Sequence, residues 1–307
     1  MKQIALIFPG QGAQYTGMGM DFYAASPESR KIFDLADEII QNDFKNVIFQ
    51  GPQEKLTLTA YSQPGIVAMS MAALAAFKAS PKFKDVEVKF AAGLSLGEYS
   101  AITAAGAIDF PDAVRLIQKR SQFMEEATKL NAGKMSAIIG VDREKIIEVC
   151  KQTGAEVANF NSPQQIVISG HAAKVEAAAK LLQEAGAKNV VFLEVSGAFH
   201  SSLMAPAAEK FSRELAGAPL VNAQFPIISN VDASPATDAE KIRANLARQI
   251  TSSVQWVDSV NFIIKQGVTD FVEIGPGKVL KGLIRRIDPS ASVYNIEKFA
   301  DIEALPF

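Results

Sequence analysis

Short apolar runs alternate along this chain with longer segments whose apolar positions recur every three or four residues. Runs of the first kind are typical of buried strands, and segments of the second kind are typical of helices. The first predicted strand is Ile4–Phe8, and the first clear helix is Glu28–Gln41, with apolar residues at helical spacing such as Ile32 and Leu35. This alternation predicts an α/β fold with a mainly parallel sheet.

The same alternation predicts the other elements of this α/β part. Further helices are expected at Gln63–Phe77, Leu96–Ala105, Asp112 to about Leu130, Leu203–Leu215, Glu240–Ile250, Val254–Lys265 and Lys278–Ile287. Further strands are expected at Phe90–Leu94, Pro226–Ser229, Asp270–Ile274 and Ser292–Asn295.

The order of predicted elements changes between Gly133 and Ser196. Strands at Lys134–Gly140, Glu156–Phe160, Gln165–Ser169 and Asn189–Val195 are interleaved with helices at Asp142–Gln152 and Ala172–Ala185. The order β-α-β-β-α-β is that of the ferredoxin-like split motif. We therefore predict a small ferredoxin-like domain at 133–196, inserted into a discontinuous large α/β domain formed by 1–132 and 197–307.

Composition narrows the possible classes of protein. The 307 residues, with 48% hydrophobic and 21% charged, are typical of a globular chain that buries a large core. The net charge of −2 gives no overall attraction for nucleic acid, so a negatively charged partner would have to meet a local basic patch. Cys150 is the only cysteine, so an internal disulfide and a cysteine zinc site are excluded. Because the sequence has neither a signal peptide nor a run of about 18 apolar residues, we expect no membrane segment and a cytoplasmic location.

The strongest candidate for chemistry is the segment Gly93-Leu94-Ser95-Leu96-Gly97. It lies between a predicted strand and a predicted helix, and a serine flanked by glycines two residues away has the spacing of a nucleophile elbow. An ordinary strand-to-helix turn, with the serine near an N-cap position, fits these five residues equally well. The two interpretations differ in whether the chain supplies a base, an oxyanion site and a substrate site.

A serine hydroxyl needs a general base, and the chain has only two histidines. His171 follows Ser169-Gly170 at the start of a predicted helix, where a surface or capping role is expected. His200 lies in a glycine-containing loop where the chain returns to the large domain, and such junctions are common places for a cleft. His200 is therefore the candidate base, although a loop histidine without catalytic function fits the sequence as well.

Two further features are compatible with acyl chemistry. Gly10-Gln11-Gly12 directly follows the first strand, and its backbone N–H groups could stabilise an oxyanion; it has neither P-loop nor dinucleotide spacing. Arg120 is three residues from both Ile117 and Phe123, which places it beside the apolar face of its helix. A charge on a long helix is usually just solvated, but a guanidinium beside the apolar face would need a carboxylate or a ligand.

Several segments, each a weak signal by itself, occur together in one order along the chain. They are Phe8-Pro9-Gly10-Gln11-Gly12-Ala13-Gln14, Ser62-Gln63-Pro64, Gly93–Tyr99, Lys119-Arg120-Ser121, Asn161–Gln165, Gly197-Ala198-Phe199-His200-Ser201, Val254-Gln255-Trp256 and Glu273–Gly277. Over residues 1 to about 298 the chain thus resembles the malonyl-CoA:acyl carrier protein transacylases of bacterial type II fatty acid synthesis. The resemblance implies a hydrolase-like α/β domain with an inserted ferredoxin-like domain.

The resemblance also implies roles for individual residues. Ser95 would attack the malonyl thioester, and His200 would accept its proton and return it to the departing thiol. The backbone N–H groups of Gln11 and Leu96 would form the oxyanion hole. Arg120 would bind the free malonyl carboxylate through two hydrogen bonds and so distinguish malonyl from acetyl.

Other positions of the family pattern complete this expected site. Gln63 would lie beside the malonyl carboxylate, Asn161 would line the cleft near the histidine, and Phe199 fits the pattern associated with malonyl rather than branched units. The main-chain carbonyl of Gln249 would orient His200, which implies a Ser–His dyad rather than a triad. One residue departs from the family: Leu94 stands where a histidine usually precedes the nucleophile.

The resemblance implies a substrate and a partner, but no permanently bound cofactor and no metal. Malonyl-CoA is the expected substrate and acyl carrier protein the expected partner of a monomeric enzyme that binds neither nucleic acid nor membrane. Because the carrier protein is acidic in this family, Lys281, Arg285 and Arg286 are candidate docking residues. The alternatives are a stand-alone malonyl acyltransferase of polyketide synthesis, a serine thioesterase or esterase, and a catalytically silent module that binds the carrier protein.

Overall fold

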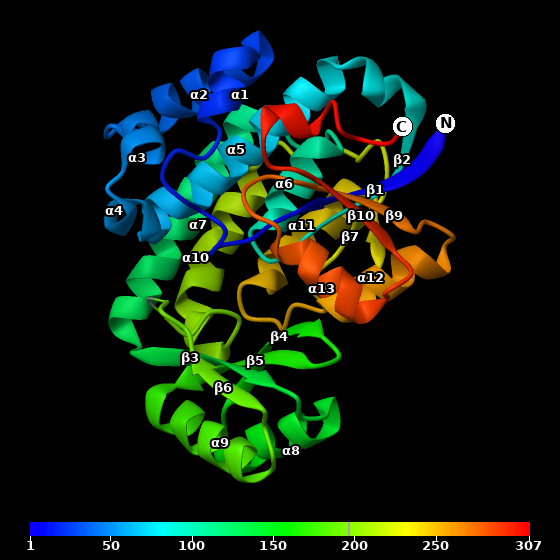
Figure 1. The fold of residues 1–307 in the computed structure, drawn as a ribbon. Helices are drawn as coiled ribbons and strands as arrows, with labels where there is room; N and C mark the ends of the chain where they lie inside the picture. Colours follow the sequence, from blue (N-terminus) through cyan, green and yellow to red (C-terminus); the bar gives the residue numbers. More distant parts are fainter. Residues whose placement is uncertain (196) are drawn as a thin grey trace.

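The fold contains two separate β-sheets. The computed structural model describes residues 1–195 and 197–307. One sheet has six strands in the order β10-β9-β1-β2-β7-β8, and the other has four strands in the order β4-β5-β3-β6 (Figure 1). The predicted α/β class, with a mainly parallel sheet and a ferredoxin-like unit, is confirmed.

The six-stranded sheet is parallel except at one edge. Its strands are β1 (Lys2–Phe8), β2 (Val86–Gly93), β7 (Ile227–Ile228), β8 (Pro235–Ala236), β9 (Asp270–Ile274) and β10 (Ser292–Ile296), and only β8 is antiparallel to its neighbour. Ile4, Leu6 and Phe8 of β1 belong to one apolar cluster, whereas Ala5 and Ile7 belong to another. Both faces of the sheet are therefore covered, which explains why β1 is an uninterrupted apolar run.

Helices of the large part cover these two faces. They are α1 (Met20–Ala25), α2 (Pro27–Ile40), α3 (Phe44–Gln50), α4 (Gln53–Thr57), α5 (Thr59–Ala79), α6 (Gly97–Ala104), α7 (Phe110–Leu130), α10 (Ala205–Gly217), α11 (Ala239–Gln249), α12 (Trp256–Lys265) and α13 (Val279–Ile287). None of the helices in the described ranges has the length and apolar character that crossing a membrane requires.

The small sheet is antiparallel throughout. It consists of β3 (Gly133–Ile139), β4 (Glu156–Ser162), β5 (Gln165–His171) and β6 (Asn189–Phe192), with α8 (Arg143–Thr153) and α9 (Ala172–Glu184) in the connections. The strand β6 is shorter than expected. Ser196, the last residue of the predicted small domain, lies outside the described residues, and the division into two domains stays a prediction.

The edge strand β4 joins the small sheet to the large part of the molecule. The N–H of Phe160 donates to the carbonyl of Val254 at 2.9 Å, and the N–H of Val254 donates to the carbonyl of Ala158 at 2.8 Å. Arg143 packs over the Phe160 ring at 3.9 Å and pairs with Asp258 at 3.2 Å. These contacts fix the position of β4, whose Asn159 and Asn161 line the main cavity.

Candidate active site

Ser95 lies in a strained turn between β2 and α6. Its φ angle is 52°, in the left-handed region that residues other than glycine rarely adopt. A Cβ atom on Gly93 would lie 1.9 Å from the carbonyl carbon of Gly97, and one on Gly97 would lie 2.1 Å from the carbonyl oxygen of Phe8. Only glycine permits this close approach of strand, turn and helix. The turn is that of a nucleophile elbow.

The Ser95 hydroxyl and the His200 ring form a hydrogen bond. The distance from Ser95 Oγ to His200 Nε2 is 2.7 Å, and His200 Nδ1 lies 3.0 Å from the carbonyl oxygen of Gln249 and 3.1 Å from that of Ser252. Because carbonyl oxygens only accept, Nδ1 carries the ring hydrogen of the neutral imidazole. Nε2 is then the free acceptor that faces Ser95 Oγ, as a general base requires.

The surroundings of His200 keep its ring neutral. Burial and, less strongly, the positive charge of Arg120 together lower the pKa of His200 to about 4, against the opposing effect of the Gln249 and Ser252 carbonyls. At pH 7 the unprotonated base is therefore the dominant form.

Arg120 projects from α7 into the interior and is fully buried. Its Nη1 donates to Gln63 Oε1 at 2.8 Å, its Nη2 donates to Gln249 Oε1 at 3.2 Å, and its carbon Cζ lies 5.3 Å from the centroid of the Tyr99 ring. Both acceptors are neutral amides, and Nε has no partner within the described part of the chain. The guanidinium therefore retains a free donor, and its charge has no salt-bridge partner in the described ranges, so it can bind an anionic ligand.

Two backbone N–H groups near Ser95 are available for an oxyanion. Neither Gln11 nor Leu96 donates its N–H to an acceptor among residues 1–195 and 197–307. Leu96 directly follows the serine and precedes the first residue of α6, so its N–H belongs to the group that a helix start leaves unbonded. Gln11 is held by its side chain, which accepts from Gln63 Nε2 at 3.4 Å.

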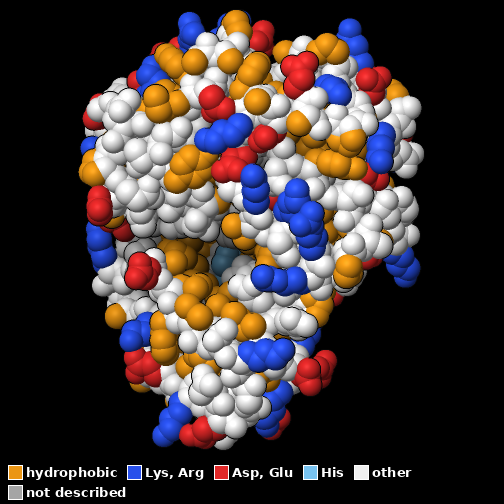
Figure 2. Space-filling model, viewed as in Figure 1, with side chains coloured by type: hydrophobic (Ala, Val, Ile, Leu, Met, Phe, Trp, Pro, Cys, Tyr) orange, Lys and Arg blue, Asp and Glu red, His pale blue; other side chains and the backbone are white. Residues whose placement is uncertain are grey.

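These residues meet in one cavity with a volume of about 560 Å³. Gln11, Ser95, Arg120, Phe199 and His200 line it, together with Leu94 and Asn161. The Asn161 Oδ1 atom is buried without a hydrogen-bond partner among the described residues, so it can accept from a ligand. Figure 2 shows this face of the molecule hollowed, with Lys and Arg side chains along one side of the opening.

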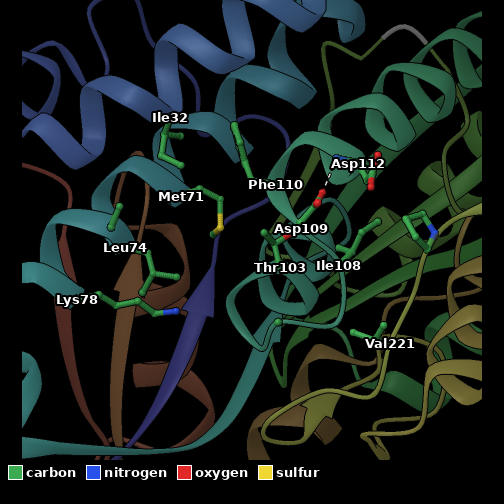
Figure 3. A pocket seen from close by; sticks show the side chains of 13 residues that line it. Ile32, Met71, Leu74, Lys78, Thr103, Ile108, Asp109, Phe110, Asp112 and Val221 are labelled. Carbon is green, nitrogen blue, oxygen red and sulfur yellow. Dashed lines mark hydrogen bonds between the residues drawn. The ribbon is translucent and has the colours of Figure 1, made fainter.

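A second cavity, of about 510 Å³, shares no lining residue with the first. Ile32, Met71, Leu74 and Phe110 give it a mainly apolar wall (Figure 3). None of its lining residues carries a buried polar side-chain atom that lacks a partner within the described ranges. Lys78, Thr103, Asp109 and Asp112 add polar groups to the wall, but neither Ser95 nor His200 lines this cavity.

Two residues with potentially reactive side chains lie outside this cavity, and one important residue of the site was not predicted. His171 is an exposed residue at the end of β5, and Cys150 is a buried thiol whose pKa is raised by burial to about 12.

Asn230 was missed: its Oδ1 accepts from the Ser95 N–H at 2.6 Å. Its position two residues beyond the carboxyl end of β7, next to the sheet edge that carries Ser95, is the signal that could have identified it. No group of three or more potential metal ligands lies together in the described ranges.

The fold and this arrangement define a class, the α/β acyl-transfer enzymes with a serine nucleophile. The family model described as "Acyl transferase domain" matches residues 5–298. The malonyl CoA-acyl carrier protein transacylase of Bacillus subtilis (strain 168) is 46% identical over 293 residues, covering 94% of this chain and 91% of the relative.

Solved structures agree with this assignment. The acyl-carrier-protein-S-malonyltransferase of Bartonella henselae superposes with a TM-score of 0.94 at 38% identity, covering 99% of this chain and 98% of that one. A malonyl-transacylase solved in complex with its type II PKS acyl-carrier protein has a TM-score of 0.94 at 39% identity, with coverage of 99% and 98%. The chain belongs to the family of malonyl CoA-acyl carrier protein transacylases.

Proposed function

We propose that this enzyme transfers the malonyl group from malonyl-CoA to the phosphopantetheine thiol of acyl carrier protein through a malonyl ester of Ser95. The observation that carries the proposal is the buried Arg120, whose charge has no anionic partner in the described chain, in the same cavity as the Ser95–His200 pair. A thioester carbonyl placed at Ser95 leaves the distal carboxylate of malonyl free to reach the guanidinium.

The proposed reaction has two symmetric halves. Ser95 Oγ attacks the thioester carbonyl while His200 Nε2 takes the hydroxyl proton, and the N–H groups of Gln11 and Leu96 stabilise the tetrahedral oxyanion. When the carbon–sulfur bond breaks, His200 returns the proton to the coenzyme A sulfur, which leaves as the thiol. The carrier-protein thiol then attacks the ester along the reverse path, with His200 accepting its proton and returning it to Ser95.

In this proposal, Arg120 and the groups that hold it select malonyl over acyl groups without a free carboxylate. Gln63 and Gln249 each accept one hydrogen bond from its guanidinium and so hold the plane of the fork in one orientation. A carboxylate bound bidentately to such a fork is fixed in direction as well as position. Phe199 and Asn161 line the rest of the acyl and pantetheine path in this proposal.

The buried arginine and the Ser95–His200 pair also distinguish this function from related activities. A malonyl acyltransferase of polyketide synthesis would use the same site, and one structural relative is bound to a type II PKS carrier protein. A serine esterase or a silent carrier-binding module has no need for an unpaired buried arginine beside an intact dyad. The nucleophile, the base and the carboxylate-binding arginine lie in one cavity. We further propose that the enzyme is a cytoplasmic monomer without a permanently bound cofactor.

Replacement of the nucleophile tests the covalent intermediate. The Ser95→Ala variant lacks the attacking oxygen, so we expect no malonyl adduct when it is mixed with malonyl-CoA. Intact-mass spectrometry of wild type and variant measures this directly. An adduct of equal yield on the variant would reject Ser95 as the nucleophile.

Replacement of Arg120 tests the assignment of acyl selectivity. Loss of two charge-assisted hydrogen bonds should slow malonyl transfer by about a hundredfold or more, while acetyl transfer is retained or increased. The matched control is Lys119→Ala, an exposed neighbour on the same helix, for which both rates should be unchanged. Equal loss of both acyl groups in Arg120→Ala would show a structural role instead.

The carrier-protein surface is proposed to include the basic end of α13. Lys281 is half-buried, Arg285 and Arg286 are exposed, and Arg286 Nη1 donates to Gln165 Oε1 of β5 at 3.3 Å. Reversing charge with Lys281→Glu and Arg285→Glu should raise the KM for carrier protein, most strongly at low salt, and leave Ser95 malonylation by malonyl-CoA unchanged. The control is Lys31→Glu on α2, and an unchanged carrier-protein KM in the α13 variants would remove this surface.

A further inference from the structure

Glu98 is a buried carboxyl group that the reaction described above does not use. It lies in the first turn of α6 and is 2% exposed. Its Oε2 accepts from Gln249 Nε2 at 2.5 Å, and its Oε1 accepts from the N–H of Asn230 at 3.3 Å. No Lys or Arg in the described ranges forms a salt bridge with it, so the groups that hydrogen-bond to it directly are neutral donors.

The first of these partners, Asn230, holds the backbone of the elbow. Asn230 Oδ1 accepts from the Ser95 N–H at 2.6 Å, and Asn230 Nδ2 donates to the Gly93 carbonyl at 2.6 Å. Its side chain therefore bridges the two sides of the turn that carries the nucleophile. The hydrogen bond from its own N–H to Glu98 ties this bridge to α6.

The second partner, Gln249, contacts every other part of the site. Its Nε2 also donates to the Ser95 carbonyl at 2.9 Å, its Oε1 accepts from Arg120, and its main-chain oxygen accepts from His200 Nδ1. Only one orientation of the side-chain amide satisfies these contacts. The NH₂ group must face Glu98 and Ser95, and the oxygen must face Arg120.

We propose that the ionised Glu98 carboxylate is the positioning residue that holds the nucleophile, the base and the carboxylate-binding arginine in one common geometry, through Asn230 and Gln249. This inference rests on the proposed function, because it concerns how the same site is held. Glu98 touches no reacting atom, and it acts through these two neighbours.

The proposal requires ionisation because both of its neighbours donate. A protonated carboxyl would present its own O–H toward a donor, and the Gln249 amide would have to rotate to accept it. Rotation would turn the NH₂ group toward the Arg120 guanidinium. The guanidinium would then lose its acceptor and face another hydrogen-bond donor. Protonation of Glu98 therefore disturbs the base and the substrate site together.

Burial brings this protonation into the neutral range. Desolvation and, to a smaller extent, the charge of Asp232 raise the pKa of Glu98 to about 7, against the hydrogen bonds from Gln249, Asn230 and Ser229, which lower it. Glu98 also interacts electrostatically with Arg120 and Tyr99, and its negative charge raises the pKa of both groups. Because the pKa of His200 lies near 4, loss of the ionised carboxylate on acidification occurs about three pH units before loss of the base.

The test compares wild type with Glu98→Gln, a permanently neutral variant of nearly the same shape. Ser95 malonylation and acetylation are followed by rapid quench and intact mass between pH 5.5 and 8.5. Wild-type malonylation should fall with a midpoint near pH 7. The variant should be about tenfold or more slower at pH 8, independent of pH through neutrality, and less selective for malonyl, and its difference from wild type should narrow steadily toward pH 5.5.

Glu273→Gln is the matched control for neutralising a buried glutamate. Glu273 is also fully buried, with a pKa raised by burial to about 7, and it accepts from the N–H groups of Leu280 and Lys281 rather than from the site. This variant should change thermal stability but keep the wild-type pH midpoint and selectivity.

Three results would overturn the proposal. They are a wild-type rate independent of pH between 6 and 8, a Glu98→Gln rate equal to wild type at pH 8, and an unchanged pH midpoint in that variant. The first result is measured on wild type, so it does not depend on whether the variant folds. In each case a malonyl adduct on wild-type Ser95 leaves the proposed function standing, whereas a wild type without any adduct rejects the function itself.

Discussion

The site is organised around one electrostatic constraint, a guanidinium enclosed in the interior without an anionic partner among the described residues. Burying such a charge is costly unless its donors are hydrogen-bonded. Gln63 and Gln249 supply two neutral acceptors, and the Tyr99 ring lies beside the charge, but Nε remains unpaired. The same charge helps to hold His200 in its neutral form. Substrate selectivity and base strength in the proposed mechanism therefore have a common origin, and a malonyl carboxylate would provide the direct ion-pair partner that Arg120 lacks among the described residues.

The backbone around Ser95 is held from several elements at once. Glycines at both ends of the turn allow β1, β2 and α6 to approach. The positive φ of Ser95 is maintained by two hydrogen bonds: its N–H donates to Asn230 Oδ1, and its carbonyl accepts from Gln249 Nε2. Leu94 belongs to this picture. It packs against the apolar cluster on one face of the sheet and lines the cavity, so the position that carries histidine in the family pattern contributes apolar contact here. In this chain the order of the elbow depends on Asn230 and Gln249.

Much of the architecture could be predicted from sequence because its elements are long and strongly patterned. The short helices α1, α3 and α4 were not predicted, because five to seven residues carry too little periodicity to be recognised. The helix α5 begins at Thr59, earlier than predicted. It contains Pro64, although a proline in a sequence usually indicates a helix boundary. Arg120 was placed correctly beside an apolar face, but its full burial could not be foreseen. Its acceptors lie 57 and 129 residues away in sequence, and only the fold brings them together. Asn230 and Ser252 were missed for the same reason.

The central claim is that Ser95 and Arg120 bind the two ends of one malonyl group. A crystal structure of the wild-type protein, trapped within its first turnover with malonyl-CoA in the absence of carrier protein, tests it most directly. The account predicts continuous density from Ser95 Oγ to an ester, its carbonyl oxygen within hydrogen-bond distance of the Gln11 and Leu96 N–H groups, and a carboxylate bound by the Arg120 fork. An acyl group bonded to another residue, or an ester whose carboxylate points away from Arg120 into the open cavity, would contradict it.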